Sequence, residues 1–356
     1  MFRFLFLTAI ALLSALPASA DHPQPLIRIG AVLPLSGGLA HLGTSYRDAM
    51  RLAVSDIPGA SRYRYELLFE DDQGQLAQTA TAARKLLDVD KVAAIVSMWS
   101  NQGNVVGPLA ASKGVPHFAC AWDKSVSRHD TTFNLSATPD TFMKDFVQEM
   151  ERRNIRTFQL IELNDSGSIS AHDQLEKQLR SSSVKMISRE QFNSGTADFR
   201  ALLTRLKAQD ADALYINAGS PELELIAQQA RQIGILRPFL TIGCFDFAAD
   251  LSPFEGAWYM TMTWPNDGFI QRYRKQYGRD IVYQLGNFHD MISILIQAFE
   301  ATYGSSGAEK SAVVHYLKSL KEFRGVLGRL TQDSERAFQS TPVFLEIKDG
   351  KRVILP

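Results

Sequence analysis

The feature that most constrains the fold is a serial alternation of strand-like and helix-like segments that begins near residue 26. The strand-like segments are short and rich in branched or aromatic residues: "LIRIGAV", "YELLFE", "KVAAIVS", "GVPHFA" and "TTFNLS". Between them, apolar residues recur at helical spacing over residues 45–56, 76–87 and 104–112. Strands and helices in series predict a parallel sheet with helices covering both of its faces.

The same pattern repeats further along the chain. "RTFQLIEL", "VKMISRE", "DALYINA" and "PFLTIG" predict strands, and residues 170–180, 197–209 and 221–233 predict helices. About 336 of the 356 residues remain after the leader described below, which is more than one hydrophobic core usually serves. We therefore expect a second α/β lobe of similar size to the first.

The last part of the chain has a different order of elements. A strand "AWYMTMTW" precedes predicted helices over 269–277, 285–303 and 310–321, and a hairpin "VFLEIKDGKRVIL" closes the sequence. This segment is too small for a third core, so we expect it to complete both lobes.

The predicted fold class is therefore α/β, with two doubly wound parallel-sheet lobes. We assign residues 26–138 and about 262–329 to the N-terminal lobe, and residues 139–261 and about 330–356 to the C-terminal lobe. Ligands of open parallel sheets bind beyond the carboxyl ends of the strands, so a ligand cleft is expected between the lobes.

Residues 1–20 have the layout of a secretory signal peptide: a positive start, an apolar run too short to span a bilayer, and the cleavage motif Ala18-Ser19-Ala20. We expect cleavage after Ala20 and an exported mature protein that is not embedded in a membrane, because no later stretch is apolar enough to span one. The chain has 38 basic and 38 acidic residues and no long basic run, so the composition gives no reason to expect nucleic acid as a partner.

The stretch "IGAVLPLSGGLAHLG" joins a strand, a Ser-Gly-Gly turn and a helix start, which are the usual parts of a ligand cradle. It contains no phosphate-binding glycine loop and no nucleophile elbow. The seven histidines are scattered, and the chain has no Cys-x-x-Cys pair, so we expect no metal and no cofactor. Binding without catalysis is the favoured interpretation, and an active site assembled from distant residues is the alternative.

Several segments resemble one known family in order along the chain. They include "IRIGAVLPLSGGLAHLGTSYRDAMRLAVSDI", "FEDDQGQLAQTATAARKLL", "VAAIVSMWSNQGNVVGPLAASKGVPHFA", "GTADFRALLTRLKAQDADALYINA" and "YGRDIVYQLGNFHDMISILIQAFE". The family is that of type I periplasmic solute-binding proteins of branched-chain amino acid (Leu/Ile/Val) ABC transporters. The resemblance implies a periplasmic receptor whose two lobes, joined by three hinge crossovers, close on a small molecule and deliver it to the permease subunits of an ABC transporter.

The resemblance also implies a set of cleft residues. Ser100 matches a hydroxyl that helps to hold a ligand carboxylate, which a serine at a helix N-terminus can do physically, although a plain N-cap is the other reading. Ala121 matches a position at which the family uses backbone groups. Leu42 and His41 match the loop that shapes the side-chain pocket, and His41 could equally be a solvated loop residue.

Three positions depart from the family pattern. Asp123 replaces a threonine that also holds the ligand carboxylate, and a second carboxylate there would repel a bound anion. Ser166 replaces a cleft-lining tyrosine. Cys244 falls near the acidic partner of the ligand ammonium, with Asp246 two residues on as a substitute. Either the acid has moved, so that Asp123 or Asp246 faces an ammonium, or the ligand is not an amino acid.

Trp99, Trp122 and Phe245 sit beside the same predicted strand ends. Aromatic rings with one or two carboxylates could hold a cation or an aromatic ligand, or the rings could simply pack in the core. We therefore expect a small polar organic ligand, an amino acid or amide-like compound first and an aromatic or cationic compound second. A sensory receptor for a membrane signalling partner, or a hydrolytic enzyme on a similar fold, are the alternative functions.

The chain has two cysteines, Cys120 and Cys244, each at the end of a predicted strand in a different lobe. A disulfide between them would clamp the cleft shut, because the bond needs Cα atoms within about 7 Å. We predict two free thiols. Asp290, within the apolar helix over 285–303, matches a family position and is expected to be structural.

Overall fold

The structure is a computed structural model that describes residues 24–57, 59–248, 250–261, 264–302 and 309–355. The expected signal peptide and the cleavage site after Ala20 lie outside these residues. Within them, no helix has the length and apolar character needed to cross a membrane.

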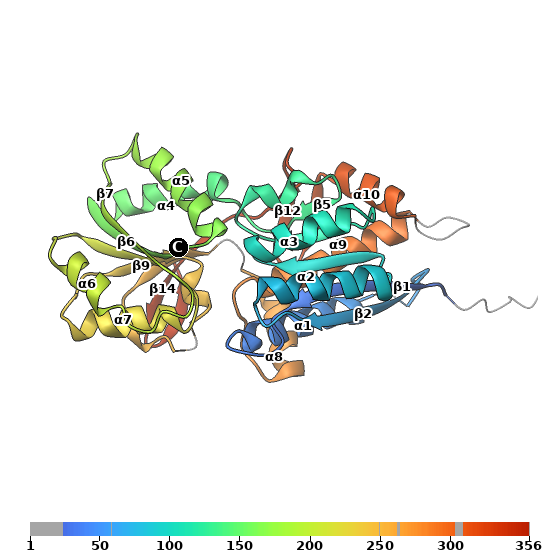
Figure 1. Ribbon diagram of the computed structural model, residues 1–356, viewed down its shortest axis with the longest axis horizontal. Helices are drawn as coiled ribbons and strands as arrows, with labels where there is room; N and C mark the ends of the chain where they lie inside the picture. Colours follow the sequence, from blue (N-terminus) through green and yellow to red (C-terminus); the bar gives the residue numbers. More distant parts are fainter. Residues whose placement is uncertain (1–23, 58, 249, 262–263, 303–308, 356) are drawn as a thin grey trace, which may run out of the picture.

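Two lobes, each built on its own sheet, lie side by side in Figure 1. In the described residues the first sheet is entirely parallel and has the order β2-β1-β3-β4-β5. Its strands are β1 (Leu26–Leu33), β2 (Arg64–Asp71), β3 (Ala94–Met98), β4 (His117–Cys120) and β5 (Thr132–Asn134). Its helices are α1 (Ala40–Ser55), α2 (Leu76–Arg84), α3 (Ser100–Ala111), α8 (Asp267–Tyr277), α9 (Leu285–Ala301) and α10 (Lys310–Ser319).

Buried side chains of strand β1 lie on both faces of the first sheet. Ile29, Ala31 and Leu33 point into the core beneath α1 and α9, whereas Val32 points into the smaller core beneath α2 and α3. A strand buried on both faces carries a nearly continuous apolar run, which is the pattern that "LIRIGAV" shows. Helices α1 and α9 are joined by Tyr46 and Phe288, whose rings stack with centroids 4.1 Å apart.

The second sheet has the order β15-β14-β10-β9-β8-β6-β7 in the described residues, parallel from β6 to β10 and antiparallel at the β14–β15 edge. Its strands are β6 (Thr157–Leu163), β7 (Lys185–Phe192), β8 (Ala213–Asn217), β9 (Phe239–Ile242), β10 (Trp258–Thr261), β14 (Val343–Lys348) and β15 (Lys351–Ile354). Helices α4 (Pro139–Arg152) and α5 (Ser166–Leu179) cover one face, and α6 (Arg200–Lys207) and α7 (Glu222–Gln232) cover the other, as Figure 1 shows. The expected α/β architecture of two parallel-sheet lobes is confirmed.

A small antiparallel sheet lies between α10 and the last crossing to the second lobe. It contains β11 (Glu322–Gly325), β12 (Gly328–Gln332) and β13 (Phe338–Gln339). Leu330 and Phe338 are buried in the core of the first lobe, and Ala337 pairs with Asn134 at the end of β5. We therefore propose that the chain returns to the second lobe at residues 340–342 rather than at about 329, with the other lobe boundaries kept as expected from the sequence.

Three helices begin four or five residues earlier than the apolar spacing predicts, and the first of them is α1, which begins at Ala40 rather than at 45. Helix α3 begins at Ser100 rather than at 104, and α5 begins at Ser166 rather than at 170. The first turns of α3 and α5 consist mostly of polar residues and glycine, which carry no apolar periodicity. These two first turns lie between the lobes, where they contact each other.

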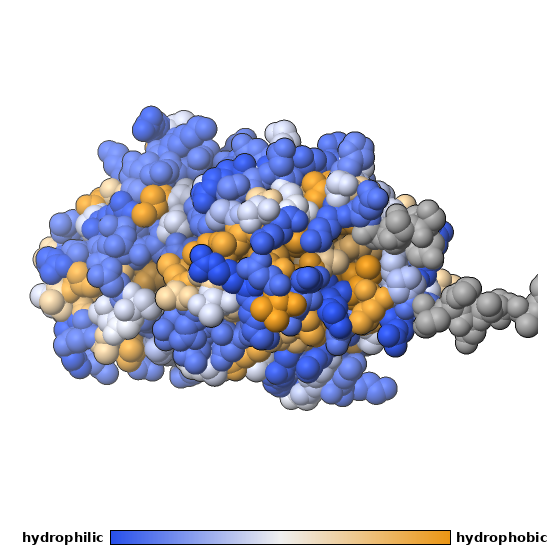
Figure 2. All heavy atoms as spheres, turned by 45° about the vertical axis from the view of Figure 1, so that its right-hand side comes forward, coloured by the Kyte–Doolittle hydropathy of each residue, from blue (hydrophilic) through white to orange (hydrophobic). Residues whose placement is uncertain are grey.

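The outer surface is largely hydrophilic on the face that Figure 2 shows, with apolar residues gathered toward its middle. Isolated apolar side chains at the surface are normal in soluble domains.

Candidate ligand-binding site

An inner cavity of about 130 Å³ lies between the carboxyl ends of the two sheets. The first lobe lines it with residues at or after the ends of β3 and β4, and the second lobe with residues at or after the ends of β6, β8 and β9. Residues just before α9 complete the lining. Its lining residues are Trp99, Ser100, Cys120, Trp122, Leu163, Asp165, Gly167, Ser168, Asn217, Ala218, Gly219, Cys244, Phe247, Tyr283 and Gln284. This is the position expected for a ligand of two facing α/β sheets.

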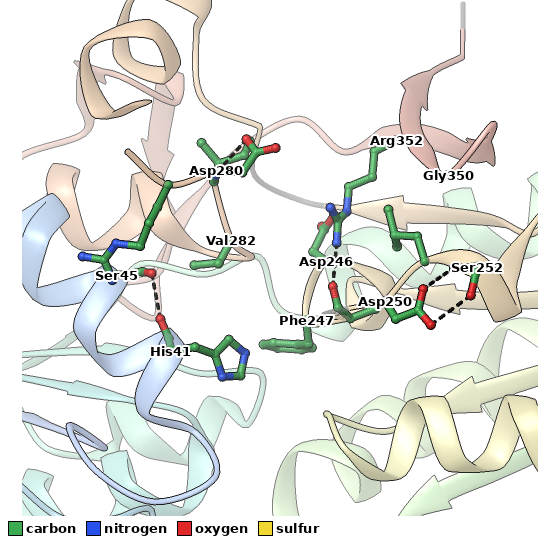
Figure 3. Close-up of a pocket in the computed structure, with 14 residues that line it drawn as sticks. His41, Ser45, Asp246, Phe247, Asp250, Ser252, Asp280, Val282, Gly350 and Arg352 are labelled. Atoms are coloured by element: carbon green, nitrogen blue, oxygen red, sulfur yellow. Dashed lines mark hydrogen bonds and ion pairs between the residues drawn. The ribbon is translucent and has the colours of Figure 1, made fainter. Parts of the chain in front are cut away.

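An outer cavity of about 600 Å³ lies next to it, and Phe247 lines both. In Figure 3, His41 and Ser45 face this space from α1, and Phe247 projects toward His41 from the second lobe. Its lining residues are His41, Ser45, Asp246, Phe247, Ala248, Asp250, Leu251, Ser252, Arg279, Asp280, Ile281, Val282, Gly350 and Arg352.

The charged side chains of the outer cavity are already paired with protein groups. Arg279 pairs with Asp48, and Asp280 pairs with Arg274. The Asp250 carboxylate accepts hydrogen bonds from the backbone N–H and the hydroxyl of Ser252, both at 2.9 Å. The outer cavity is therefore an open entrance to the inner one, and its charged side chains stabilise the surrounding loops rather than a ligand.

Ser100 lies in the inner cavity, as expected, and is 6% exposed. It is the first residue of α3 and not its N-cap, because the N-cap position belongs to Trp99. The Ser100 hydroxyl oxygen accepts the backbone N–H groups of Trp122 at 3.2 Å and of Asp123 at 3.1 Å. The hydroxyl proton stays available for an acceptor at the positive end of the helix.

Two of the predicted tryptophans also line the inner cavity. Trp99 has φ 58°, a left-handed backbone conformation that is strained for a residue with a side chain. Its ring meets Phe247 edge to face at 6.2 Å, and Phe247 meets Tyr283 in the same way at 4.8 Å. Trp122 of the first lobe also lines the cavity and packs on Phe142 at 5.6 Å. Both lobes therefore contribute aromatic rings to the lining of the cavity.

Asp123 lies outside both sets of lining residues. One carboxylate oxygen accepts the Ser125 N–H at 2.8 Å and caps a short 3₁₀ turn, Lys124–Arg128. The other oxygen accepts the Asn104 amide at 2.9 Å and the Ser125 hydroxyl at 2.7 Å. The Asp123 carboxylate, one of the two that the sequence predicts to face an ammonium, is thus engaged in a local turn.

Asp246 lines the outer cavity rather than the inner one. Its carboxylate accepts the Tyr259 hydroxyl at 2.5 Å and forms an ion pair with Arg352 at 3.3 Å. Burial raises the pKa of this carboxyl group, and Arg352 opposes the rise. Arg352 comes from β15, more than a hundred residues later, so the partner could not be foreseen from the local sequence.

Ser166 joins the two lobes directly. Its hydroxyl donates to the Asn101 side-chain oxygen of α3 at 2.8 Å, and the residue itself lies beside the lining of the inner cavity rather than in it. The next residue, Gly167, does line the cavity. The N-terminal turns of α3 and α5 therefore meet across the cleft.

The remaining expected site residues have structural positions. Ala121 is buried, and Asn134 hydrogen-bonds both its N–H, at 3.0 Å, and its carbonyl, at 2.8 Å. Leu42 is buried in the first core, and Phe245 is buried in the second, where it packs on Phe254 at 4.6 Å. The Ser-Gly-Gly turn also lies away from the inner cavity, because Ser36 is tied to Asp71.

Both cysteines line the inner cavity and both are free, as predicted. The Cys120 thiol donates to the Leu135 carbonyl at 3.3 Å, and the Cys244 thiol donates to the Asn217 side-chain oxygen at 3.3 Å. Burial raises the pKa of Cys244 to about 11 and raises that of Cys120 as well. At neutral pH both groups are therefore protonated thiols and weak hydrogen-bond donors.

Sequence reasoning missed Asp165, Asn217, Tyr283, Gln284 and Phe247. Asp165 belongs to the motif "NDSGS", whose serine drew attention instead, and its position before a helix was a readable N-cap signal. Gln284 had no signal, because nothing marks the residue before an apolar helix as part of a cleft.

The sequence as a whole has clear relatives. The family described as "Periplasmic binding protein" matches residues 26–351. Leu/Ile/Val-binding protein homolog 7 of Brucella suis is 24% identical over 305 residues, which is 76% of this chain and 74% of that protein. An amino acid binding protein of Pseudomonas aeruginosa is 22% identical over 239 residues, which is 64% and 63% of the two chains.

Solved structures share the fold. A leucine-binding protein, LivK, of Thermotoga maritima superposes with a TM-score of 0.84 at 20% identity, covering 93% of this chain and 98% of that one. A solute-binding protein of an ABC transporter from Rhodopseudomonas palustris, solved with 3,4-dihydroxybenzoic acid, has a TM-score of 0.82 at 17% identity and covers 93% and 96%. The same architecture thus surrounds an amino-acid-binding site in one relative and an aromatic acid in another.

Proposed function

The chain belongs to the periplasmic binding protein family, in its type I branched-chain amino acid-binding branch, and we propose that it is the periplasmic solute-binding component of an ABC importer. In this role it captures a small polar organic molecule in the periplasm and delivers it to permease subunits in the membrane. The observation that supports this proposal best is the inner cavity, which the strand ends of both lobes line together.

Hinge closure is the proposed mechanism. A ligand in the inner cavity would contact Ser100 and Trp122 of the first lobe and Asp165 and Asn217 of the second at the same time. The closed form gains contacts that the open form lacks, so ligand binding shifts the population toward closure. Direct contacts such as the hydrogen bond from Ser166 to Asn101 support the closed arrangement without a covalent link.

Binding without chemical turnover is part of this proposal. In the described residues, the lining of the inner cavity contains hydroxyl and thiol groups but no histidine that could activate them. Ser100 accepts two backbone N–H groups, which suits a hydrogen-bonding group better than a nucleophile.

The proposed ligand is an amino acid or an amide-like compound. Ser100 at the start of α3 supplies a hydroxyl donor for a carboxylate or carbonyl, and the side chains of Asn217 and Gln284 supply amide groups. The four aromatic rings around the cavity support an aromatic ligand as the alternative, by analogy with the relative solved with 3,4-dihydroxybenzoic acid.

A ligand screen tests the proposal. The mature chain is heated with each member of a panel of amino acids, aromatic acids and quaternary amines, because a ligand that binds only the folded state raises its stability. A ligand at a hundred times its Kd should add about 2.7 kcal/mol, and small-angle scattering should show a more compact particle. Failure of every compound to raise the melting temperature, together with an unchanged particle size, would overturn the proposal.

A further inference from the structure

The inner cavity contains a carboxylate without a counter-ion. One oxygen of Asp165 accepts the Ser168 N–H at 2.7 Å, which caps α5. Across the described part of the chain, this carboxylate forms no ion pair, and no lysine, arginine or histidine lines the inner cavity. The N-terminus of α5 offsets part of the negative charge, but it does not neutralise it.

A second polar group in the same cavity also lacks a partner. Gln284 is 3% exposed, and no described residue hydrogen-bonds its side-chain oxygen. The residue holds the N-cap position of α9 with φ 59°, a left-handed conformation, yet its side chain does not cap the helix. A buried amide oxygen without a partner, on a strained backbone, is costly unless a ligand group donates to it.

The other carboxylates near the strand ends are occupied. Asp246 is held by Tyr259 and Arg352, and Asp123 is held by Ser125 and Asn104. Asp165 is the carboxylate in the lining of the inner cavity, within the residues that the structure describes.

A hydrogen-bond donor, the Ser100 hydroxyl, lies close to this acceptor. A Cβ placed on Gly167 would lie 3.0 Å from the Ser100 hydroxyl oxygen and 3.6 Å from a carboxylate oxygen of Asp165. The Ser100 hydroxyl and the Asp165 carboxylate therefore border the same small space. A ligand that fills it should carry an acceptor and a charged donor only a few atoms apart.

We propose that Asp165, with the side-chain oxygen of Gln284, receives the protonated amino group of the ligand, so that the cleft selects compounds bearing an ammonium beside a carboxylate over simple carboxylic acids. This inference rests on the proposed function, because it names the ligand class of the same cavity. The sequence pointed to Asp246 or Asp123 as the acid that faces the ligand ammonium. The present inference gives this role to Asp165, the N-cap of α5.

Isothermal titration calorimetry on the mature chain tests the assignment with matched ligand pairs. L-leucine is compared with 4-methylpentanoate, L-phenylalanine with 3-phenylpropanoate, and L-glutamine with 4-carbamoylbutanoate, each acid lacking only the amino group. We expect at least one amino acid to bind, and its partner acid to bind at least tenfold more weakly.

The variant Asp165→Asn removes the charge and keeps the cap, because the asparagine oxygen can still accept the Ser168 N–H. It should weaken the amino acid at least tenfold and leave the partner acid unchanged or tighter. Asp250→Asn is the matched control, since Asp250 caps a turn in the outer cavity, and it should change neither affinity. Gln284→Met keeps the volume, loses the amide and should weaken the amino acid severalfold.

Three results would overturn the inference: equal affinity for an amino acid and its partner acid, unchanged amino acid binding in both Asp165→Asn and Gln284→Met, or a larger loss in Asp250→Asn. If acids alone bind and close the lobes, the proposed function stands and this inference fails. If no compound of this panel or of the wider screen binds, the proposed function fails as well. Gln284→Met keeps the test decisive if Asp165→Asn does not fold.

Discussion

Gly167 of the second lobe packs directly against Ser100 of the first, so closely that a Cβ on Gly167 would lie 3.0 Å from the serine hydroxyl oxygen. The contact joins the first turns of α5 and α3 at the edge of the inner cavity. A residue without a side chain at this point lets the two helix ends approach each other. The closeness of the lobes therefore depends on this glycine.

Gly167→Ala should impair ligand binding without harming the fold. Alanine is favoured over glycine within a helix by about 0.5–1 kcal/mol, so the second lobe should be as stable as before or slightly more stable. The new methyl group would push Ser100 away and hold the lobes apart. We expect at least a tenfold loss of affinity in calorimetry for the best compound of the screen.

Gly38→Ala is the matched control for this substitution. No atom lies within 4 Å of a Cβ placed on Gly38, so the same chemical change there has room. Its affinity and melting temperature should match those of the wild type. Equal affinity in Gly167→Ala and Gly38→Ala would show that the lobes close without the contact between Gly167 and Ser100.

The hydrogen bond from Ser166 to Asn101 should contribute modestly to closure. The Ser166 hydroxyl oxygen lies 2.8 Å from the Asn101 side-chain oxygen across the lobes. A hydrogen bond of this kind contributes a net stabilisation of roughly 0.5–1.5 kcal/mol. Ser166→Ala should therefore weaken ligand binding by about two- to tenfold. The double variant with Asn101→Ala should lose no more than either single variant, because both remove the same bond. Fully additive losses in the cycle would mean that the two side chains act separately.

The fold could be predicted from the sequence because buried positions recur at the spacing of a strand or of a helix. Strand β1 is buried on both faces and reads as a continuous apolar run, and Phe288 in α9 recurs at helical spacing with the other core residues of its helix. The first turns of α3 and α5 escaped prediction, because Ser100 and Ser166 are polar and small, and their role comes from the facing lobe rather than from their own helix.

The candidate site was only partly predictable for a similar reason. Ser100 could be placed at the cavity because the family resemblance matches it to a hydroxyl that holds a ligand carboxylate. Asp123 and Asp246 could not be excluded from it, because the groups that engage them, Asn104 and Arg352, are 19 and 106 residues away in the sequence. Only the tertiary structure shows which carboxylate keeps a free oxygen.

The two thiols should report on the closed cavity. With the pKa of Cys244 raised to about 11 by burial, only about one thiol in a thousand is ionised there at pH 8, and Cys120 is shifted in the same direction. Alkylation by iodoacetamide should therefore be at least a hundredfold slower in the native protein than in denaturant. In the variant Cys120→Ala, any alkylation that is still observed occurs at Cys244. Rapid native labelling, or an intact mass 2 Da lower under non-reducing conditions, would contradict the assignment of two buried free thiols.

Acid should destabilise the first lobe through His117. This residue is fully buried in β4, where its ring nitrogens lie 2.8 Å from the Ser97 hydroxyl and 3.3 Å from the Thr132 hydroxyl. Burial, with a smaller contribution from His129, lowers the pKa of His117 from 6.5 to about 3. The unfolded chain binds this proton more readily than the folded one, so the stability that the neutral ring provides is complete above pH 6.5 and is lost as the pH falls toward 3.

The size of this effect is about 3 kcal/mol between pH 7 and pH 4, since each pKa unit corresponds to about 1.4 kcal/mol. Urea unfolding at the two pH values measures it, and His117→Gln is the comparison, because other groups also titrate in this range and are unchanged in the variant. The variant should lose about 3 kcal/mol less than the wild type on acidification, whatever its stability at pH 7. NMR of the ring nitrogens gives an independent check, with at most about a tenth of His117 protonated at pH 4. A ring that titrates near pH 6.5 in the folded protein, or an equal acid loss in both proteins, would show that the Ser97–His117–Thr132 network accommodates the charge.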